Sequence, residues 1–250
     1  MSSDTLFLND ENTLYGRMKT ACQEDWHNYC HHPFVLGMAD GSLPIASFRH
    51  YLQQDYLFLI HFARAYSLAV YKSDNLEDMR SASESVSGIL GEMTLHLAYC
   101  REWGLTEKDV VSLPEARANM AYTRYVLERG MAGDILDLYT ALSPCAVGYA
   151  EIGYRLKNDP DTLKEGNPYW AWIETYGGKN FLAVPESRSN SWSSWPGPVT
   201  TPPEWMLSVR LSGKRPAWKS ASGRWVWTAH SNVRWQFAIL CYPEVSNNNS

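Results

Sequence analysis

The feature that most constrains the fold of this chain is a stretch from Ile45 to Tyr71 in which apolar side chains recur every third or fourth residue. Its apolar positions are Phe48, Tyr51, Leu52, Leu59, Phe62, Ala63 and Tyr66. This spacing places side chains on one face of an α-helix, whereas a strand requires strict alternation. The stretch therefore predicts a long amphipathic helix whose apolar face packs against other helices.

Similar periods elsewhere predict further helices, with proline and glycine at the breaks between them. The predicted helices cover residues near 10–29, 75–103, 114–129, 134–156 and 169–176. Pro114 is expected to open one of them and Asp134 to cap the next, because proline suits a first turn and aspartate accepts hydrogen bonds there. No strand pattern competes with helix before Gly178, so the chain is predicted to be an all-α bundle.

The chain changes character after Phe181. Four prolines between residues 196 and 203 forbid a helix there, and seven of the eleven tryptophans lie at Trp192 or beyond without helical period. We predict a helical domain over residues 1–181 that lacks its terminal helices, then an atypical, irregular and poorly ordered tail over residues 182–250. The tail resembles translated non-coding or frame-shifted sequence, and short alternating runs leave a loose strand pair as the alternative.

Charge and composition exclude several classes of function. The net charge is -5 and there is no long basic run, which argues against nucleic acid or an anionic membrane as partner. No apolar stretch approaches the roughly 20 residues of a membrane span, and the first residues do not read as a secretory signal. The five cysteines form no C-x-x-C pair, so neither a disulfide framework nor a structural zinc site is expected. We predict a cytoplasmic protein.

Cys145 and Tyr149 lie four residues apart in the predicted helix that follows Asp134. This spacing puts a thiol and a phenol on one helix face, one turn apart. Pro144 removes one backbone hydrogen bond beside them and tends to bend the helix. Two interpretations stay open: Cys145 is a nucleophile at a local distortion, or it is a small core residue.

Asp55 falls on the apolar face of the long predicted helix, and Phe58 follows one turn later. Burying a carboxylate is costly unless hydrogen bonds or a positive group compensate. Asp55 is therefore either a functional acid or the member of a structural pair with a residue such as Arg64 or His61.

Glu92 and His96 lie four residues apart, so one helix face carries a carboxylate and an imidazole. Such pairs ligate iron or manganese in helical bundles, but those sites draw several ligands from different helices. The sequence offers only this one carboxylate–imidazole pair. We therefore predict that Glu92 and His96 are joined by a hydrogen bond, and a metal-dependent oxidase remains the alternative. The adjacent His31 and His32 point apart, and a capping or loop role is predicted for them.

An ordered set of motifs resembles the TenA-type thiaminase II (aminopyrimidine aminohydrolase) family over about residues 14–181. The motifs are His32-Pro-Phe-Val-Leu-Gly, Asp40-Gly-Ser-Leu-Pro, Phe48-Arg-His-Tyr-Leu-Gln-Gln-Asp-Tyr-Leu-Phe58, Glu92-Met-Thr-Leu-His96, Ser143-Pro-Cys145 and Trp172-Ile-Glu-Thr-Tyr-Gly-Gly178. The resemblance implies a heme-oxygenase-like helical fold, no metal and no cofactor, and a homotetramer if the bundle closes.

The resemblance also assigns roles to particular residues. Cys145 would be the nucleophile that adds to the pyrimidine ring, and Asp55 would bind the amino group and ring nitrogen, since an anionic acceptor strengthens N–H contacts. Phe58 would pack on the ring, where some relatives have tyrosine. Three further residues align with the pocket tyrosines of the family and would position the thiol: Tyr122, Tyr149 and Tyr176.

The implied reaction is the hydrolysis of 4-amino-5-aminomethyl-2-methylpyrimidine to the hydroxymethylpyrimidine in thiamin salvage, with thiamin cleavage as a lesser activity. One departure weakens it, because the family carries a catalytic glutamate on its last helix and this segment is not found. The acids of the tail, Glu186, Glu204 and Glu244, lie in no comparable context. General acid–base assistance is worth roughly 10²- to 10⁴-fold, so the alternative is a chain that binds aminopyrimidine with little or no turnover.

Overall fold

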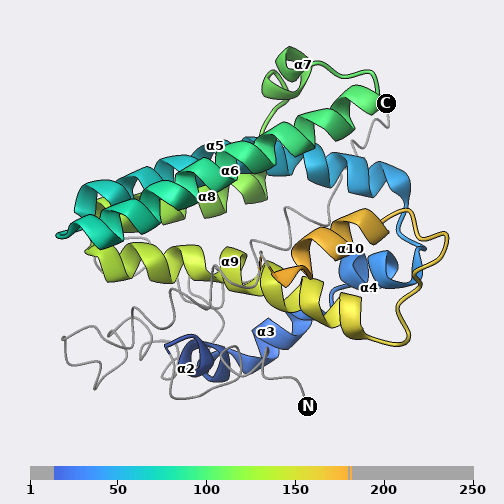
Figure 1. The fold of residues 1–250 in the computed structure, drawn as a ribbon, viewed down its shortest axis with the longest axis horizontal. Coiled ribbons are helices and arrows are strands. Elements are labelled where there is room, and N and C mark those ends of the chain that lie inside the picture. Colours follow the sequence, from blue (N-terminus) through green and yellow to red (C-terminus); the bar gives the residue numbers. More distant parts are fainter. Residues whose placement is uncertain (1–13, 180, 182–250) are drawn as a thin grey trace, which may run out of the picture. The chain divides into compact units, whose positions relative to one another are not determined.

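The computed structural model describes residues 14–179 and 181, and every element that it assigns there is a helix (Figure 1). The helices are α2 (Leu14–Ala21), α3 (Gln23–Cys30), α4 (Pro33–Asp40), α5 (Ile45–Lys72), α6 (Leu76–Glu102), α7 (Glu107–Val111), α8 (Arg117–Ala132), α9 (Ile135–Asn158) and α10 (Trp170–Tyr176). The predicted all-α fold is therefore confirmed for this part of the chain. The predicted tail, residues 182–250, lies outside the described residues.

The described residues fall into two compact units. Unit 1 combines residues 14–41 with residues 145–181, and unit 2 consists of residues 42–144. The boundary falls inside α9, between Pro144 and Cys145. No helix in the described part of the chain is long and apolar enough to span a bilayer.

Unit 2 is built on α5, which lies against α6 and α8 (Figure 1). The apolar stripe predicted for this helix is buried almost throughout, and Tyr51, Leu52 and Phe62 belong to the core. The short helix α7 contacts both α5 and α6. The predicted long amphipathic helix is thus confirmed within one residue of its predicted end.

The start of α8 differs from the prediction, which placed it at Pro114. The helix begins at Arg117, because the buried side chain of Gln54 engages the preceding backbone. Its amide donates to the Pro114 carbonyl at 3.1 Å, and its carbonyl oxygen accepts from the Ala116 N–H at 2.8 Å. Asn119 on α8 donates in turn to the Gln54 backbone carbonyl at 2.9 Å. A tertiary contact therefore sets this helix end.

Local side-chain caps confirm two further predictions and correct a third. His32 caps α4 by accepting from the Phe34 N–H at 3.2 Å, and Asp134 caps α9 by accepting from the Asp137 N–H at 2.9 Å. The single helix predicted up to Tyr29 is wrong within the described residues, since α2 and α3 are separate. The chain leaves helical geometry at Cys22, where φ is -128° and ψ is 37°.

Pro144 lies inside α9 and has no N–H to give to the Thr140 carbonyl one turn earlier. The hydroxyl of Ser143 donates to that carbonyl instead, at 2.9 Å, and both residues are buried. The side chain next to the proline therefore replaces the hydrogen bond that the proline removes.

In unit 1, the part of α9 from Cys145 onwards carries residues that contact the amino-terminal helices α2 and α3. Glu151 accepts from the Lys19 ammonium at 2.8 Å and from the Trp26 indole N–H at 2.9 Å. Gly148 lies against the ring of Tyr29, where no Cβ would fit. These contacts fix α2 and α3 against α9.

Candidate active site

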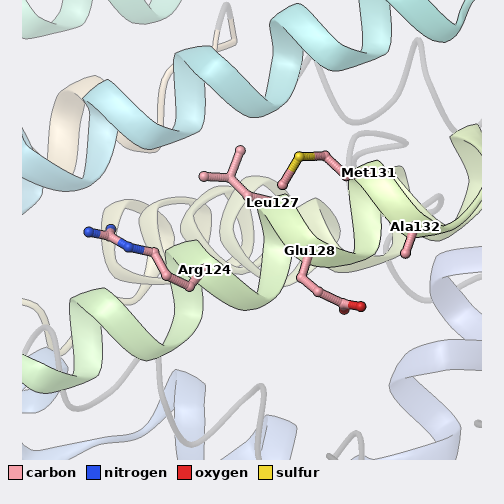
Figure 2. Close-up of a pocket in the computed structure, with 5 residues that line it drawn as sticks. All are labelled: Arg124, Leu127, Glu128, Met131 and Ala132. Carbon is pink, nitrogen blue, oxygen red and sulfur yellow. The ribbon is translucent and has the colours of Figure 1, made fainter.

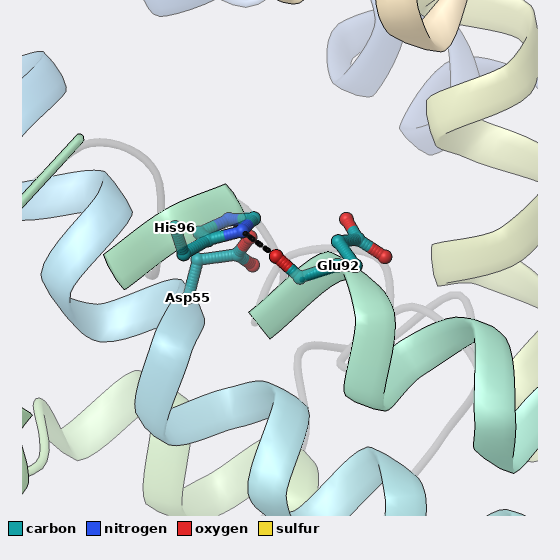
Figure 3. Close-up of side chains that lie close together, drawn as sticks. All are labelled: Asp55, Glu92 and His96. Carbon is teal, nitrogen blue, oxygen red and sulfur yellow. Dashed lines mark hydrogen bonds and ion pairs between the residues drawn. The ribbon is translucent and has the colours of Figure 1, made fainter. Parts of the chain in front are cut away.

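Asp55 is buried in unit 2, with an exposed fraction of 3%. Its carboxylate accepts a hydrogen bond from Nε2 of His96 on α6, and Oδ2 and Nε2 are 2.7 Å apart. Figure 3 shows the Asp55 and His96 side chains next to each other, with Glu92 nearby. The hydroxyl of Tyr51 makes a longer contact of 3.5 Å with the same oxygen. Asp55 thus has the compensating partner that burial of a carboxylate requires.

The partner of Asp55 is neither of the residues that the sequence suggested. His61 instead lies 3.0 Å from the Glu115 carboxylate and 2.9 Å from the Arg124 guanidinium. His96 is 41 residues from Asp55 along the chain. The signal in the sequence that could have identified His96 is its place on the apolar stripe of α6, where the structure buries it.

The second ring nitrogen of His96 faces another acceptor. Nδ1 lies 3.0 Å from the backbone carbonyl oxygen of Glu92, one turn earlier on α6. The hydrogen bond predicted between these two residues thus involves the Glu92 backbone, while the charge pair of His96 is with Asp55. A neutral imidazole has one N–H, whereas an imidazolium has two and can donate to both acceptors.

The electrostatic surroundings favour the same charged form. Burial acts to lower the pKa of His96, but the hydrogen bond and charge of Asp55 and the charge of Glu92 outweigh it and raise this pKa from 6.5 to about 9. Unit 2 therefore contains a buried ion pair between an imidazolium and a carboxylate at neutral pH.

The side chains of Asp55, Glu92 and His96 are also close enough to be considered as a metal site, because their donor atoms all lie within 4.8 Å of one another. The structure thus adds Asp55, from a second helix, to the pair seen in the sequence. The 2.7 Å between Nε2 and Oδ2 is the length of a charge-assisted hydrogen bond. Carboxylate-bridged metal sites of helical bundles take ligands from four helices, whereas these residues come from two. The arrangement fits a proton between the two groups better than a cation.

An aromatic wall adjoins Asp55 along α5. The ring of Phe58 lies nearly parallel to that of Tyr122 on α8, with centroids 5.8 Å apart and an angle of 12° between the planes. Phe62 continues the wall, 4.9 Å from Phe58. The hydroxyl of Tyr122 donates to the Ala141 carbonyl at 2.9 Å, which fixes the ring in place.

The remaining predicted site residues lie in unit 1. Cys145 and Tyr149 are on α9, Tyr176 is on α10, and all three are buried. The rings of Tyr149 and Tyr176 are 5.2 Å apart, and Trp172 lies 4.4 Å from Tyr176 and 5.9 Å from Tyr149. Trp172 was not among the predicted residues, although its position one turn before Tyr176 was a signal for it.

The structure thus brings the predicted residues together in two groups. Asp55, Phe58 and Tyr122 form a carboxylate beside an aromatic wall in unit 2, and unit 1 holds Cys145 with an aromatic cluster. That both groups act on one substrate stays a prediction. The tail acids Glu186, Glu204 and Glu244 lie outside the described residues.

Three other cysteines are poorly suited to nucleophilic chemistry. Burial, with a smaller contribution from the charge of Asp25, raises the pKa of Cys22 to about 11. Burial also raises the pKa of Cys30 and that of Cys100. These thiols stay protonated at neutral pH, and the thiolate is the nucleophilic form.

A hollow of about 450 Å³ lies along α8 (Figure 2). Its lining residues are Arg124, Leu127, Glu128, Met131 and Ala132. All of them belong to one helix, and none is a predicted site residue. Among the described residues, the hollow therefore involves one face of α8 and brings together no chemical groups from different elements.

Comparison with known proteins relates this chain to one family. The model of the TENA/THI-4/PQQC family matches residues 20–192. An uncharacterized protein of Haemophilus influenzae is 43% identical over 159 residues, which are 64% of this chain and 74% of that protein. The aminopyrimidine aminohydrolase of Halalkalibacterium halodurans is 36% identical over 161 residues, 64% of this chain and 71% of that enzyme. The solved structure of a TenA family transcription regulator from Silicibacter sp. TM1040 superimposes with a TM-score of 0.74 at 34% identity, covering 90% of this chain and 96% of that one.

Proposed function

The chain belongs to the TENA/THI-4/PQQC family, and from this premise we propose that it hydrolyses a thiamin-derived aminopyrimidine. The substrate is 4-amino-5-aminomethyl-2-methylpyrimidine and the product is the hydroxymethylpyrimidine, a step of thiamin salvage, with thiamin cleavage as a lesser activity. Relatives at 33–36% identity are named aminopyrimidine aminohydrolase. As in the resemblance, a homotetramer is expected if the bundle closes.

The observation that carries the proposal is the buried, charged Asp55 beside an aromatic wall. An aminopyrimidine is a flat ring whose amino group and protonated ring nitrogen are hydrogen-bond donors. A carboxylate is a strong acceptor for those donors, and aromatic side chains pack on the faces of such a ring. Asp55 and Phe58 combine both properties within one turn of α5.

Cys145 is the proposed nucleophile. Its thiolate forms a bond to a ring carbon, and the electron pair displaced through the ring breaks the bond between the exocyclic methylene and its amino group. The amino group leaves as ammonia after taking up a proton. Water then adds to the methylene and loses a proton, the thiolate is expelled, and the aromatic ring is restored.

Turnover of the aminomethyl substrate by purified wild type, Cys145→Ala and Cys22→Ala tests the proposal, with ammonia and hydroxymethylpyrimidine both quantified. We expect loss of at least about 10²-fold for Cys145→Ala, since a covalent route is removed, and wild-type rates for Cys22→Ala, whose thiol is protonated. Equal rates for wild type and Cys145→Ala would exclude the thiol mechanism.

A second candidate function follows from the catalytic glutamate of the family, for which the sequence shows no residue in the expected context. A chain without this acid binds aminopyrimidine and releases little product, because general acid–base assistance is missing. Calorimetric binding of hydroxymethylpyrimidine to wild type, without ammonia release from the aminomethyl substrate, would establish this alternative. If the protein neither binds hydroxymethylpyrimidine nor releases ammonia, both proposed functions are refuted.

A further inference from the structure

The pair of Asp55 and His96 contains a residue to which the family resemblance assigned no role. We propose that His96 is a positioning residue, clamped between the Asp55 carboxylate and the Glu92 backbone carbonyl, that holds Asp55 in one orientation and presents its Oδ1 to the aminopyrimidine. This inference rests on the proposed function and names a further residue for the same site.

The clamp follows from the distances at the two ring nitrogens. Nε2 is 2.7 Å from the Asp55 carboxylate and Nδ1 is 3.0 Å from the Glu92 carbonyl. The two atoms that face these nitrogens are oxygens that only accept hydrogen bonds, so only the doubly protonated ring satisfies both contacts. The Glu92 carbonyl belongs to the backbone of α6, which gives the imidazolium a rigid support.

The orientation of the carboxylate follows from which oxygen is engaged. Both hydrogen bonds that the described residues make to Asp55, from His96 and Tyr51, end on Oδ2. Oδ1 is therefore the oxygen that remains for a further donor. Rotation of the carboxylate would cost the charge-assisted bond at Oδ2, so His96 selects the direction in which Oδ1 accepts.

The charged groups around His96 make this clamp sensitive to pH. Asp55 faces the ring from α5, with the Tyr51 hydroxyl on the same oxygen, and Glu92 acts from α6 itself. On α7, which also contacts α6, Glu107 accepts instead from the Tyr56 hydroxyl at 2.9 Å. Asp55 and Glu92 together raise the pKa of His96 to about 9 against the effect of burial, so the clamp is intact at pH 7.5 and opens as the pH rises through that pKa.

Two substitutions separate the charge of His96 from its hydrogen bond. His96→Gln keeps an N–H near the position of Nε2 but cannot titrate, whereas His96→Leu removes both the donor and the charge. His61→Gln is the matched control, because His61 is a partly buried histidine of the same unit that contacts Glu115 and Arg124. We expect the control to bind like wild type at every pH.

The test is calorimetric binding of hydroxymethylpyrimidine between pH 7.5 and 10. This ligand lacks the aminomethyl group, so it does not itself titrate in that range. For His96→Leu we expect binding about 10- to 100-fold weaker at pH 7.5, the range of a hydrogen bond to a charged group. His96→Gln should bind more tightly than His96→Leu, and should lack the loss of affinity that wild type shows near pH 9.

The results that overturn the inference differ from those that overturn the function. If wild type binds and both His96 variants bind equally well with the wild-type pH profile, His96 does not position Asp55. If wild type does not bind, the proposed function fails, and ¹⁵N NMR of the histidine rings then decides the inference about His96. A resonance lost in His96→Gln and typical of imidazolium at pH 7.5 supports the clamp, whereas a neutral ring refutes it.

Discussion

The hydroxyl of Ser143 is expected to stabilise α9 only because Pro144 follows it. Ser143→Ala removes the donor that lies 2.9 Å from the Thr140 carbonyl, and Pro144 has no N–H to replace it. Both Ser143 and Thr140 are buried, so water cannot readily take over the bond. An unsatisfied buried acceptor costs about 1–3 kcal/mol, and we expect a loss of that size in the free energy of unfolding.

A double-mutant cycle with Pro144→Ala isolates this effect. An alanine at position 144 restores a backbone N–H to the Thr140 carbonyl, so Ser143→Ala should cost less than about 0.5 kcal/mol in that background. The free energies come from urea unfolding of all four proteins, with circular dichroism at 222 nm as the signal. An equal cost of Ser143→Ala with and without Pro144 would refute the reasoning, because the hydroxyl would then act independently of the missing N–H.

Two further outcomes are expected. Because the pKa of His96 is about 9 in the folded chain against an ordinary 6.5, its pairing with Asp55 stabilises the fold fully below pH 6.5 and is lost as the pH rises towards 9. The free energy of unfolding of wild type should thus fall by up to about 3 kcal/mol over that window relative to His96→Leu in urea titrations, and parallel curves would contradict the pairing. Gly148→Ala should lower the melting temperature, since its Cβ would overlap the Tyr29 ring, by an amount equivalent to about 1–3 kcal/mol. Gly91→Ala on α6 is the control, because its Cβ meets no atom within 4 Å, and it should be neutral or stabilising; equal melting temperatures for both variants would argue against the close contact.

Local chemistry determined the parts of this protein that the sequence predicted well. The period of α5 is a property of consecutive residues, so its extent and its buried face followed from the sequence. The caps by His32 and Asp134 also act over two or three residues. The burial of Asp55 followed for the same reason, since its place on the apolar face is set by its neighbours on the helix.

Contacts between helices decided what the sequence left open. Periodicity tells which face of a helix is buried but not which residue of another helix meets it. For this reason Asp55 pairs with His96 on α6 rather than with His61, which is nearer in the sequence. For the same reason Gln54 rather than Pro114 sets the start of α8. By itself the sequence determined a chain of amphipathic helices with a carboxylate on a buried face. The packing of α5 against α6 supplied the imidazole that compensates the free-energy cost of burying that carboxylate.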